Sequence, residues 1–170
     1  MIRFPLLAVF LIFSILIATS SFAELDGEAF ALRKEADSYA WGSNGYLQNP
    51  KEAITLYKKY LKRVGAPTLE NDSRNIMHTI GNLYWDELNN PNEALIWYNK
   101  SAELGFFGAQ MTLGRIYLEG KIVTKSLEKS AYWIKTAYEN PSEHAQGNDY
   151  TQGQKYLAKD FWDEHKLWQY

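Results

Sequence analysis

The chain has 170 residues, and its 18 lysines and arginines against 20 acidic residues give a formal net charge of −2 at pH 7. No basic stripe runs along the sequence, which argues against a nucleic acid as the partner. The sequence contains no cysteine, which excludes disulfide bonds and a membrane anchor built on a lipidated cysteine.

The first 23 residues have the features of a signal peptide. Arg3 supplies the positive charge, an apolar run follows from Phe4 to Ala18, and small residues precede Glu24 at the usual cleavage positions. We predict a cleavable signal peptide over residues 1–23. The apolar run is shorter than the roughly 20 residues that a membrane-spanning helix prefers, so retention of this segment as an anchor is the weaker alternative.

The rest of the chain shows the spacing of amphipathic helices. Apolar residues three and four apart predict a first helix that ends near Trp41 and a second from about Pro50 to Val64. The same pattern predicts helices over residues 73–88, 91–104, 108–118, 127–139 and 151–168. The apolar stripe of the last helix is predicted to comprise Tyr150, Leu157, Phe161 and Trp168.

The central stretch from Asn90 carries clear signals for helix ends. Asn90 is placed to cap the helix that Pro91 begins, and Glu93 completes a capping-box pattern. Gly105 follows the last periodic residue, where a left-handed backbone commonly ends a helix. A second helix follows at once, so this stretch is predicted to form a helix, a glycine turn and a helix.

Parts of this stretch recur elsewhere in the sequence. Residues 49–59 match residues 90–100 at an offset of 41, and residues 80–84 match residues 113–117 at an offset of 33. A weaker copy of the capped helix begins at Ser126, at an offset of 36. Variable offsets between matching helices indicate loops of different length around one packing unit, and periods in this range are typical of helical solenoids.

The matched positions resemble those of the Sel1-like repeat family, a relative of the tetratricopeptide repeat. The positions that fit the first half of the family pattern are Ala109, Leu113, Gly114, Tyr117 and Gly120. Those that fit the second half are Ala94, Trp97, Tyr98, Lys100, Ala102 and Gly105. In the first repeat, Ser38 takes the place of the family glycine and Trp41 that of the tyrosine.

The resemblance implies an all-α fold: an α-solenoid of about three antiparallel helix pairs. We expect a single domain over residues 24–170, with repeats over about residues 28–65, 73–105 and 108–140. A C-terminal helix over residues 150–170 would cap the last open face, as solenoids require.

Residues that could carry chemistry form no recognisable site. His78, His144 and His165 lack the spacing of a metal site. The sequence contains no nucleophile elbow and no phosphate-binding glycine loop. Gly81 and Gly114 fall inside predicted helices at the same register, which indicates close approach of helices. We therefore predict no catalytic activity, no metal and no cofactor.

The resemblance also implies that the first helix of each pair lines a concave groove. Transferring that geometry gives a predicted partner-binding groove of Asn75, His78, Asn82, Trp85, Asp86, Met111, Arg115 and Glu119. Trp85 is expected to be exposed, beside polar and charged residues of the kind found at binding hot spots. Burial of Trp85 beneath a neighbouring loop is the alternative.

The function expected from this resemblance is protein–protein interaction in the periplasm, through a groove short enough for a peptide or small domain. Two roles fit: an adaptor for an envelope complex, or an immunity-type antagonist of a toxin delivered to the periplasm. The alternatives are a cell-wall glycan-binding protein and a hydrolase of cell-wall-type substrates. Membrane contact is expected only through the signal peptide. The partner and any self-association stay open.

Overall fold

The computed structural model describes residues 27–65, 72–140 and 149–170, so the predicted signal peptide and His144 lie outside the described residues. The chain divides into two compact units, Met1–Gly65 and Ala66–Tyr170. The single domain expected over residues 24–170 stays a prediction. In the described segments, no helix is both long and apolar enough to cross a membrane.

The first unit contains a helix over residues 27–41 and α2 (Pro50–Val64). The side chain of Asn49 caps α2 by accepting a hydrogen bond from the Glu52 amide at 3.2 Å. Tyr57 is fully buried on α2, and its hydroxyl donates to Asp37 Oδ1 at 2.5 Å. Burial and the Asp37 carboxylate raise the pKa of Tyr57, so this neutral hydroxyl fastens the two helices together.

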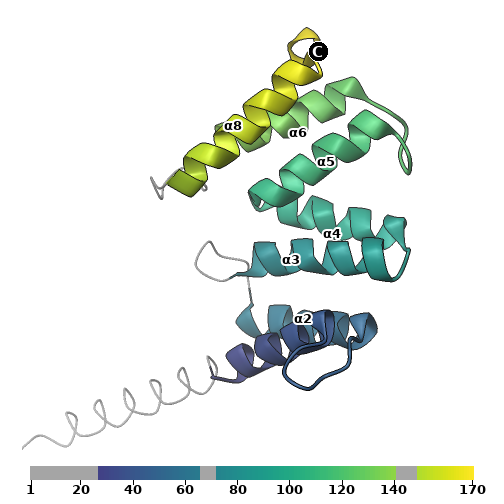
Figure 1. Cartoon of the computed structure of the whole chain (residues 1–170), viewed down its shortest axis with the longest axis vertical. Helices are drawn as coiled ribbons and strands as arrows, with labels where there is room; N and C mark the ends of the chain where they lie inside the picture. Colours follow the sequence, from purple (N-terminus) through teal and green to yellow (C-terminus); the bar gives the residue numbers. More distant parts are fainter. Residues whose placement is uncertain (1–26, 66–71, 141–148) are drawn as a thin grey trace, which may run out of the picture. The chain divides into compact units, whose positions relative to one another are not determined.

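The second unit is a succession of helices, shown from teal to yellow in Figure 1. They are α3 (Ser73–Asn82), the π-helix η1 (Leu83–Glu87), α4 (Pro91–Glu103), α5 (Phe107–Glu119), α6 (Leu127–Glu139), α8 (Asp149–Glu164) and the 3-10 helix η2 (Leu167–Gln169). The pairs α3–α4 and α5–α6 are antiparallel helix pairs of the predicted kind, which confirms the all-α repeat fold.

The C-terminal helix packs on the last pair as predicted, through part of the predicted stripe. Phe161 packs against the cluster of Ala131, Ile134 and Leu167 as predicted, whereas Leu157 and Trp168 are 62% and 55% exposed. The helix stops at Glu164, and Lys166 adopts a left-handed backbone (φ 51°) that turns Leu167 inward. The Trp168 prediction is wrong because helical periodicity was extended past the end of α8.

The end of the α3 helix also differs from the prediction of one α-helix to Leu88. Its last turn is π-helical, and the Leu88 amide donates to the Leu83 carbonyl at 3.1 Å. The wider turn leads directly into the α4 cap, where the Asn90 side chain accepts from the Glu93 amide at 3.3 Å. Side-chain spacing carries no signal for a single wide turn.

One backbone hydrogen bond recurs in all three repeats and fixes their register. The amide of each helix cap donates to a tyrosine carbonyl: Asn49 to Tyr39 (2.8 Å), Asn90 to Tyr84 (2.8 Å) and Ser126 to Tyr117 (2.9 Å). The connections between these tyrosines and caps differ in length. Loop length therefore varies while the closing hydrogen bond is kept.

This hydrogen bond corrects the register expected for the first repeat. Tyr39, and not Trp41, is equivalent to Tyr84, and Trp41 is 62% exposed. Counting back three residues, fully buried Ala36 occupies the glycine position in place of Ser38. The expected register is wrong by two residues, because the match relied on an aromatic side chain while the tyrosine contributes its backbone carbonyl.

Gly81 and Gly114 confirm the predicted close approach within each pair. A Cβ atom on Gly81 would lie 2.5 Å from Tyr98 Cε1, and one on Gly114 would lie 2.7 Å from Ile134 Cγ1. Both distances are too short for carbon atoms in contact. Glycine at these positions therefore lets the two helices of each pair pack against one another, and the glycines serve the fold.

Candidate partner-binding groove

A cavity of about 440 Å³ lies between the two helix pairs of the second unit. The side chains that line it are His78, Asn82, Trp85, Asp86, Tyr98, Thr112, Arg115, Ile116, Glu119, Lys121 and Ile122. Six of the eight predicted groove residues are among them: His78, Asn82, Trp85, Asp86, Arg115 and Glu119. We call this cavity the groove. Whether a partner contacts these residues stays a prediction.

Helices α3 and α5 spread apart towards their C-terminal ends (Figure 1). At one end of the groove, His78 Nε2 lies 3.4 Å from Thr112 Oγ1, which brings α3 and α5 together there. The Thr112 hydroxyl donates to the Gly108 carbonyl at 2.8 Å, so its oxygen is left to accept from the histidine. This assigns the proton of the neutral ring to Nε2.

The environment of His78 favours the neutral imidazole. Its ring centroid lies 5.5 Å from that of Tyr98 and 5.2 Å from that of Phe106. Burial among these rings, with a further contribution from the positive charge of Arg115, lowers the pKa of His78 to about 4. His78 is therefore an uncharged polar group at the closed end of the groove.

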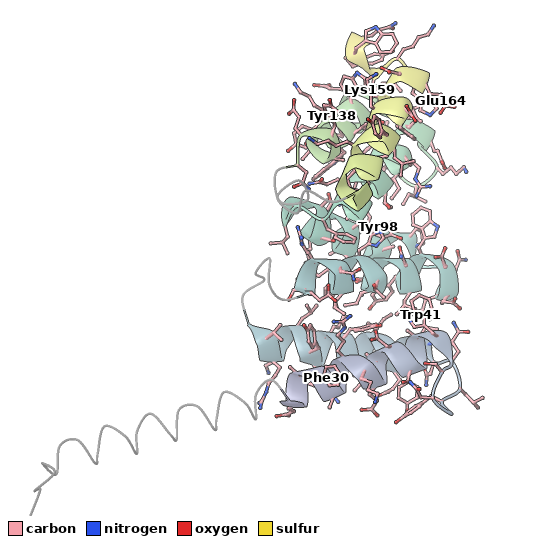
Figure 2. The ribbon with its side chains drawn as sticks, turned by 60° about the vertical axis from the view of Figure 1, so that its left-hand side comes forward. Phe30, Trp41, Tyr98, Tyr138, Lys159 and Glu164 are labelled. Atoms are coloured by element: carbon pink, nitrogen blue, oxygen red, sulfur yellow. The ribbon has the colours of Figure 1, made fainter. Side chains whose placement is uncertain are left out.

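Tyr98, labelled in Figure 2, belongs to α4, and its side chain forms the floor of the groove. Its hydroxyl donates to Asn82 Oδ1 at 3.0 Å, and the Trp85 ring centroid lies 6.2 Å from its own. Burial and the nearby Asp86 carboxylate raise the pKa of Tyr98. Trp85 is half-buried against the α4–α5 core, so it is less exposed than predicted but still reaches the cavity.

Four charged side chains surround the open end of the groove. Asp86, Arg115, Glu119 and Lys121 are all exposed. Glu119 Oε2 and Lys121 Nζ form an ion pair at 2.9 Å. In the part of the chain that the structure describes, neither Asp86 nor Arg115 has an ion-pair partner. The rim thus carries one internally neutralised pair and two opposite charges available to a ligand.

Two predicted groove residues lie elsewhere. Asn75 is half-buried on α3 and does not line the cavity. Met111 is partly buried and packs against Phe107, Ala137 and Ala158. Met111 is the third-repeat equivalent of His78 at an offset of 33, but α8 covers this position in the last pair. Asn75 and Met111 therefore lie outside the groove, and contact of a partner with either residue stays a prediction.

Sequence reasoning missed five lining residues: Tyr98, Thr112, Ile116, Lys121 and Ile122. Tyr98 was assigned to the buried face, and it is indeed 3% exposed while still forming the floor. The α5 lining residues 112, 115, 116 and 119 have helical spacing, so a stripe shifted by one residue from Met111 could have been found. Lys121 and Ile122 belong to the connection after α5, whose course the sequence does not give.

Within the described segments, no three His, Asp or Glu side chains lie close enough together to bind a metal ion.

Comparison with known proteins identifies the class. The family model for the Sel1 repeat matches residues 31–59, 81–106 and 108–142, which together make up more than half of the chain. The chain therefore belongs to the Sel1 repeat family. Proteins of this family typically mediate protein–protein interaction and are generally non-catalytic.

Solved structures with a similar fold support this assignment. One is a protective antigen present in uropathogenic Escherichia coli strains that displays an SLR fold, with 25% identity and a TM-score of 0.52 over 76% of this chain and 27% of that chain. Another is a Sel1 repeat protein from Oxalobacter formigenes, with 24% identity and a TM-score of 0.53 over 81% and 58%. This chain spans less than two thirds of either structure. No curated protein matches it.

Proposed function

We propose that this chain is an exported, non-catalytic interaction module that binds a peptide or a small protein domain in the groove between α3 and α5. The sequence of residues 1–23 supports export, and a periplasmic location fits best. Within this function, the protein serves either as an adaptor in an envelope complex or as an immunity-type antagonist of a periplasm-targeted toxin.

The observation that carries the proposal is the composition of the groove. Aromatic rings of Trp85 and Tyr98 lie beside the neutral polar groups of Asn82 and His78, and charged side chains form the rim. Binding hot spots are enriched in tryptophan, tyrosine and arginine surrounded by groups that exclude water. A volume of about 440 Å³ accommodates a few side chains of a partner.

The groove is tested with the full chain, which is tagged at its C-terminus and produced in a Gram-negative host. The tagged protein is used to retain partners from envelope extracts. Trp85→Ala is expected to lower retention of a stoichiometric protein partner at least about tenfold, as for a hot spot worth more than 1.4 kcal/mol. Trp168→Ala is the matched control, because it removes an equally large ring that is 55% exposed outside the groove.

Trp85 also packs on the core, so a second variant separates binding from stability. Arg115→Glu changes an exposed rim residue and should weaken partner retention with little change in melting temperature. Equal retention by the wild type and both variants would refute groove binding. The identity of the partner then distinguishes the two roles, since an adaptor retains an envelope protein of its own cell and an antagonist retains a delivered toxin.

Export is tested separately by cell fractionation and intact-mass measurement. A periplasmic protein that begins at Glu24 is expected. A full-length mass in the membrane fraction would instead support the anchor alternative.

Binding of a cell-wall glycan is a second candidate, favoured by the Trp85 and Tyr98 rings beside the Asn82 amide. Sugars commonly pack an apolar face on aromatic rings while amides bind their hydroxyls. Saturable binding of purified muropeptides that is lost in Trp85→Ala, with no protein retained, would replace the protein partner by this ligand.

A further inference from the structure

We propose that the groove recognises a linear polypeptide segment that presents one basic and one acidic side chain. The basic side chain lies beside Trp85 and pairs with Asp86, and the acidic side chain pairs with Arg115. This inference rests on the proposed function and specifies the chemistry of its partner.

The starting point is the uneven pairing of the four rim charges. Glu119 and Lys121 neutralise each other at 2.9 Å. Asp86 and Arg115 are both exposed and, among the residues that the structure describes, have no ion-pair partner. They come from different elements, η1 and α5, and line the same cavity. A ligand in the groove therefore meets one free carboxylate and one free guanidinium.

Asp86 has no ion-pair partner among the described residues because the connection that follows it is short. Asp86 is equivalent to Glu119 at an offset of 33. In the third repeat, a long connection to α6 brings Lys121 to Glu119. In the second repeat, the connection from Glu87 to Pro91 is Leu-Asn-Asn and contains no basic residue. The shorter connection leaves the Asp86 carboxylate without a local cation.

For Arg115, the reason is a difference in side chains between the second and third repeats. Arg115 is equivalent to Asn82, whose side-chain oxygen accepts from the Tyr98 hydroxyl at 3.0 Å. The third repeat has Ile134 in place of Tyr98. An aliphatic side chain offers no hydrogen bond to position 115, so the guanidinium is left at the rim.

The surroundings of each charge decide which partner group it takes. Asp86 adjoins Trp85, whose ring lies near that of Tyr98, so a basic side chain there gains both a carboxylate and an aromatic face. Arg115 can bind a carboxylate through two parallel hydrogen bonds. A partner with two like charges would place one of them against a like charge of the groove, which is unfavourable.

The test uses synthetic peptides of equal length and the full chain, with binding followed by fluorescence anisotropy. Four sets carry one basic and one acidic residue, two basic residues, two acidic residues, or no charged residue, and spacing and order vary within each set. We expect the mixed-charge set to bind at least about tenfold more tightly than the others, and to lose most of this advantage in high salt.

Charge-neutral variants of Asp86 and Arg115 test which residue of the groove pairs with which charged residue of the peptide. Asp86→Asn should remove the benefit of the basic residue alone, and Arg115→Gln that of the acidic residue alone. Asp160→Asn and Lys135→Gln are the matched controls, because both side chains are exposed outside the groove and should leave the preference unchanged.

The outcomes separate this inference from the proposed function. Equal binding of all four sets that is lost in Trp85→Ala would overturn the charge preference and keep the groove as the binding site. Binding that Trp85→Ala leaves unchanged would overturn both. If no peptide of any set binds, the linear-segment inference is wrong, and the retention experiment with whole proteins decides the function independently.

Discussion

The α3–α4 and α5–α6 pairs follow one sequence pattern but use it differently. In both pairs a glycine, Gly81 or Gly114, admits a side chain of the second helix. In the first pair that side chain is Tyr98, whose ring forms the groove floor and whose hydroxyl reaches Asn82. In the second pair it is Ile134, which is fully buried. The shared positions build the fold, and the positions that differ build the groove.

The first helices of the two pairs show the same division. His78 and Met111 are equivalent, yet His78 lines the groove and Met111 packs against the buried cluster of Phe107, Ala137 and Ala158. What decides between the two environments is the element that follows the helix pair. Beyond α3, helix α5 spreads away and leaves a cavity, whereas beyond α5 the C-terminal helix α8 and Leu167 cover the surface. A groove therefore opens between the two pairs, and the C-terminal cover closes the equivalent place.

The largest expected effect comes from the histidine that distinguishes the two pairs. The pKa of His78 is lowered from 6.5 to about 4 in the folded protein. Between these pH values the unfolded chain binds more protons, so stability is full above about pH 6.5 and falls as the pH approaches 4. At about 1.4 kcal/mol per pH unit, this amounts to at most about 3.5 kcal/mol.

His78→Met, which copies position 111, should abolish this acid-dependent loss. Urea unfolding of the wild type and the variant between pH 7 and pH 4 measures the difference. His165→Gln is the matched control, since it removes a histidine outside the groove. An unchanged acid slope in His78→Met would show that His78 is not the responsible group.

The two glycines provide the next comparison. Gly114→Ala should lower the free energy of unfolding by about 2 kcal/mol, because overpacking costs about 1–3 kcal/mol and the gain in helix propensity is about 1 kcal/mol. Ile134 is fully buried, so its side chain has little room to shift. In Gly81→Ala, the Tyr98 ring can shift into the cavity, so the expected loss is about 1 kcal/mol or less, accompanied by weaker partner binding. Equal losses of stability in the two variants would contradict this distinction.

A buried serine at a position that is alanine in the preceding pair gives a smaller effect. Ser130 is fully buried, and its hydroxyl donates to the Gly114 carbonyl at 2.8 Å. The equivalent residue in the preceding pair is Ala94, at an offset of 36. Ser130→Ala should therefore be tolerated with a loss of about 1 kcal/mol, the usual contribution of one hydrogen bond. Thermal unfolding tests this, and a loss above about 3 kcal/mol would indicate a larger role.

The sequence predicted those features of the fold that depend on side-chain type at regular spacing. The caps at Asn49 and Asn90 and the left-handed Gly105 are examples, and all three are present. It did not predict the π-helical turn at residues 83–87 or the end of α8 before Lys166, because both depend on backbone geometry. The register error at Ser38 and Trp41 has the same origin, since the hydrogen bond that recurs in the three repeats uses the backbone carbonyl of the tyrosine.

For the groove, the geometry implied by the family resemblance selected residues that line one wall of the cavity. His78, Asn82, Trp85 and Asp86 share a helical face and line the cavity together. Met111 does not line the cavity, because its environment depends on α8, which is distant in sequence. Tyr98 was assigned to the buried face and not to the groove, although a buried ring can also form the floor of a cavity. Tertiary cover therefore decides which positions of a helical stripe reach the groove.

The smallest predicted effect tests whether the groove floor acts through its ring or its hydroxyl. Tyr98→Phe keeps the ring that packs on Gly81 and removes the hydrogen bond to Asn82 Oδ1. Water in the groove can replace that bond, so the expected loss of stability is about 0.5 kcal/mol, at the low end for one hydrogen bond. Tyr132→Phe, at an exposed ring outside the groove, is the matched control for removing one hydroxyl.

Partner binding should change little in Tyr98→Phe, because the aromatic face beside Trp85 is retained. A loss of binding as large as that of Trp85→Ala, with stability preserved, would instead show that the hydroxyl holds Asn82 in place for the partner. That result would make the Tyr98–Asn82 hydrogen bond the main functional difference between the two pairs, since Ile134 and Arg115 at the equivalent positions cannot form it.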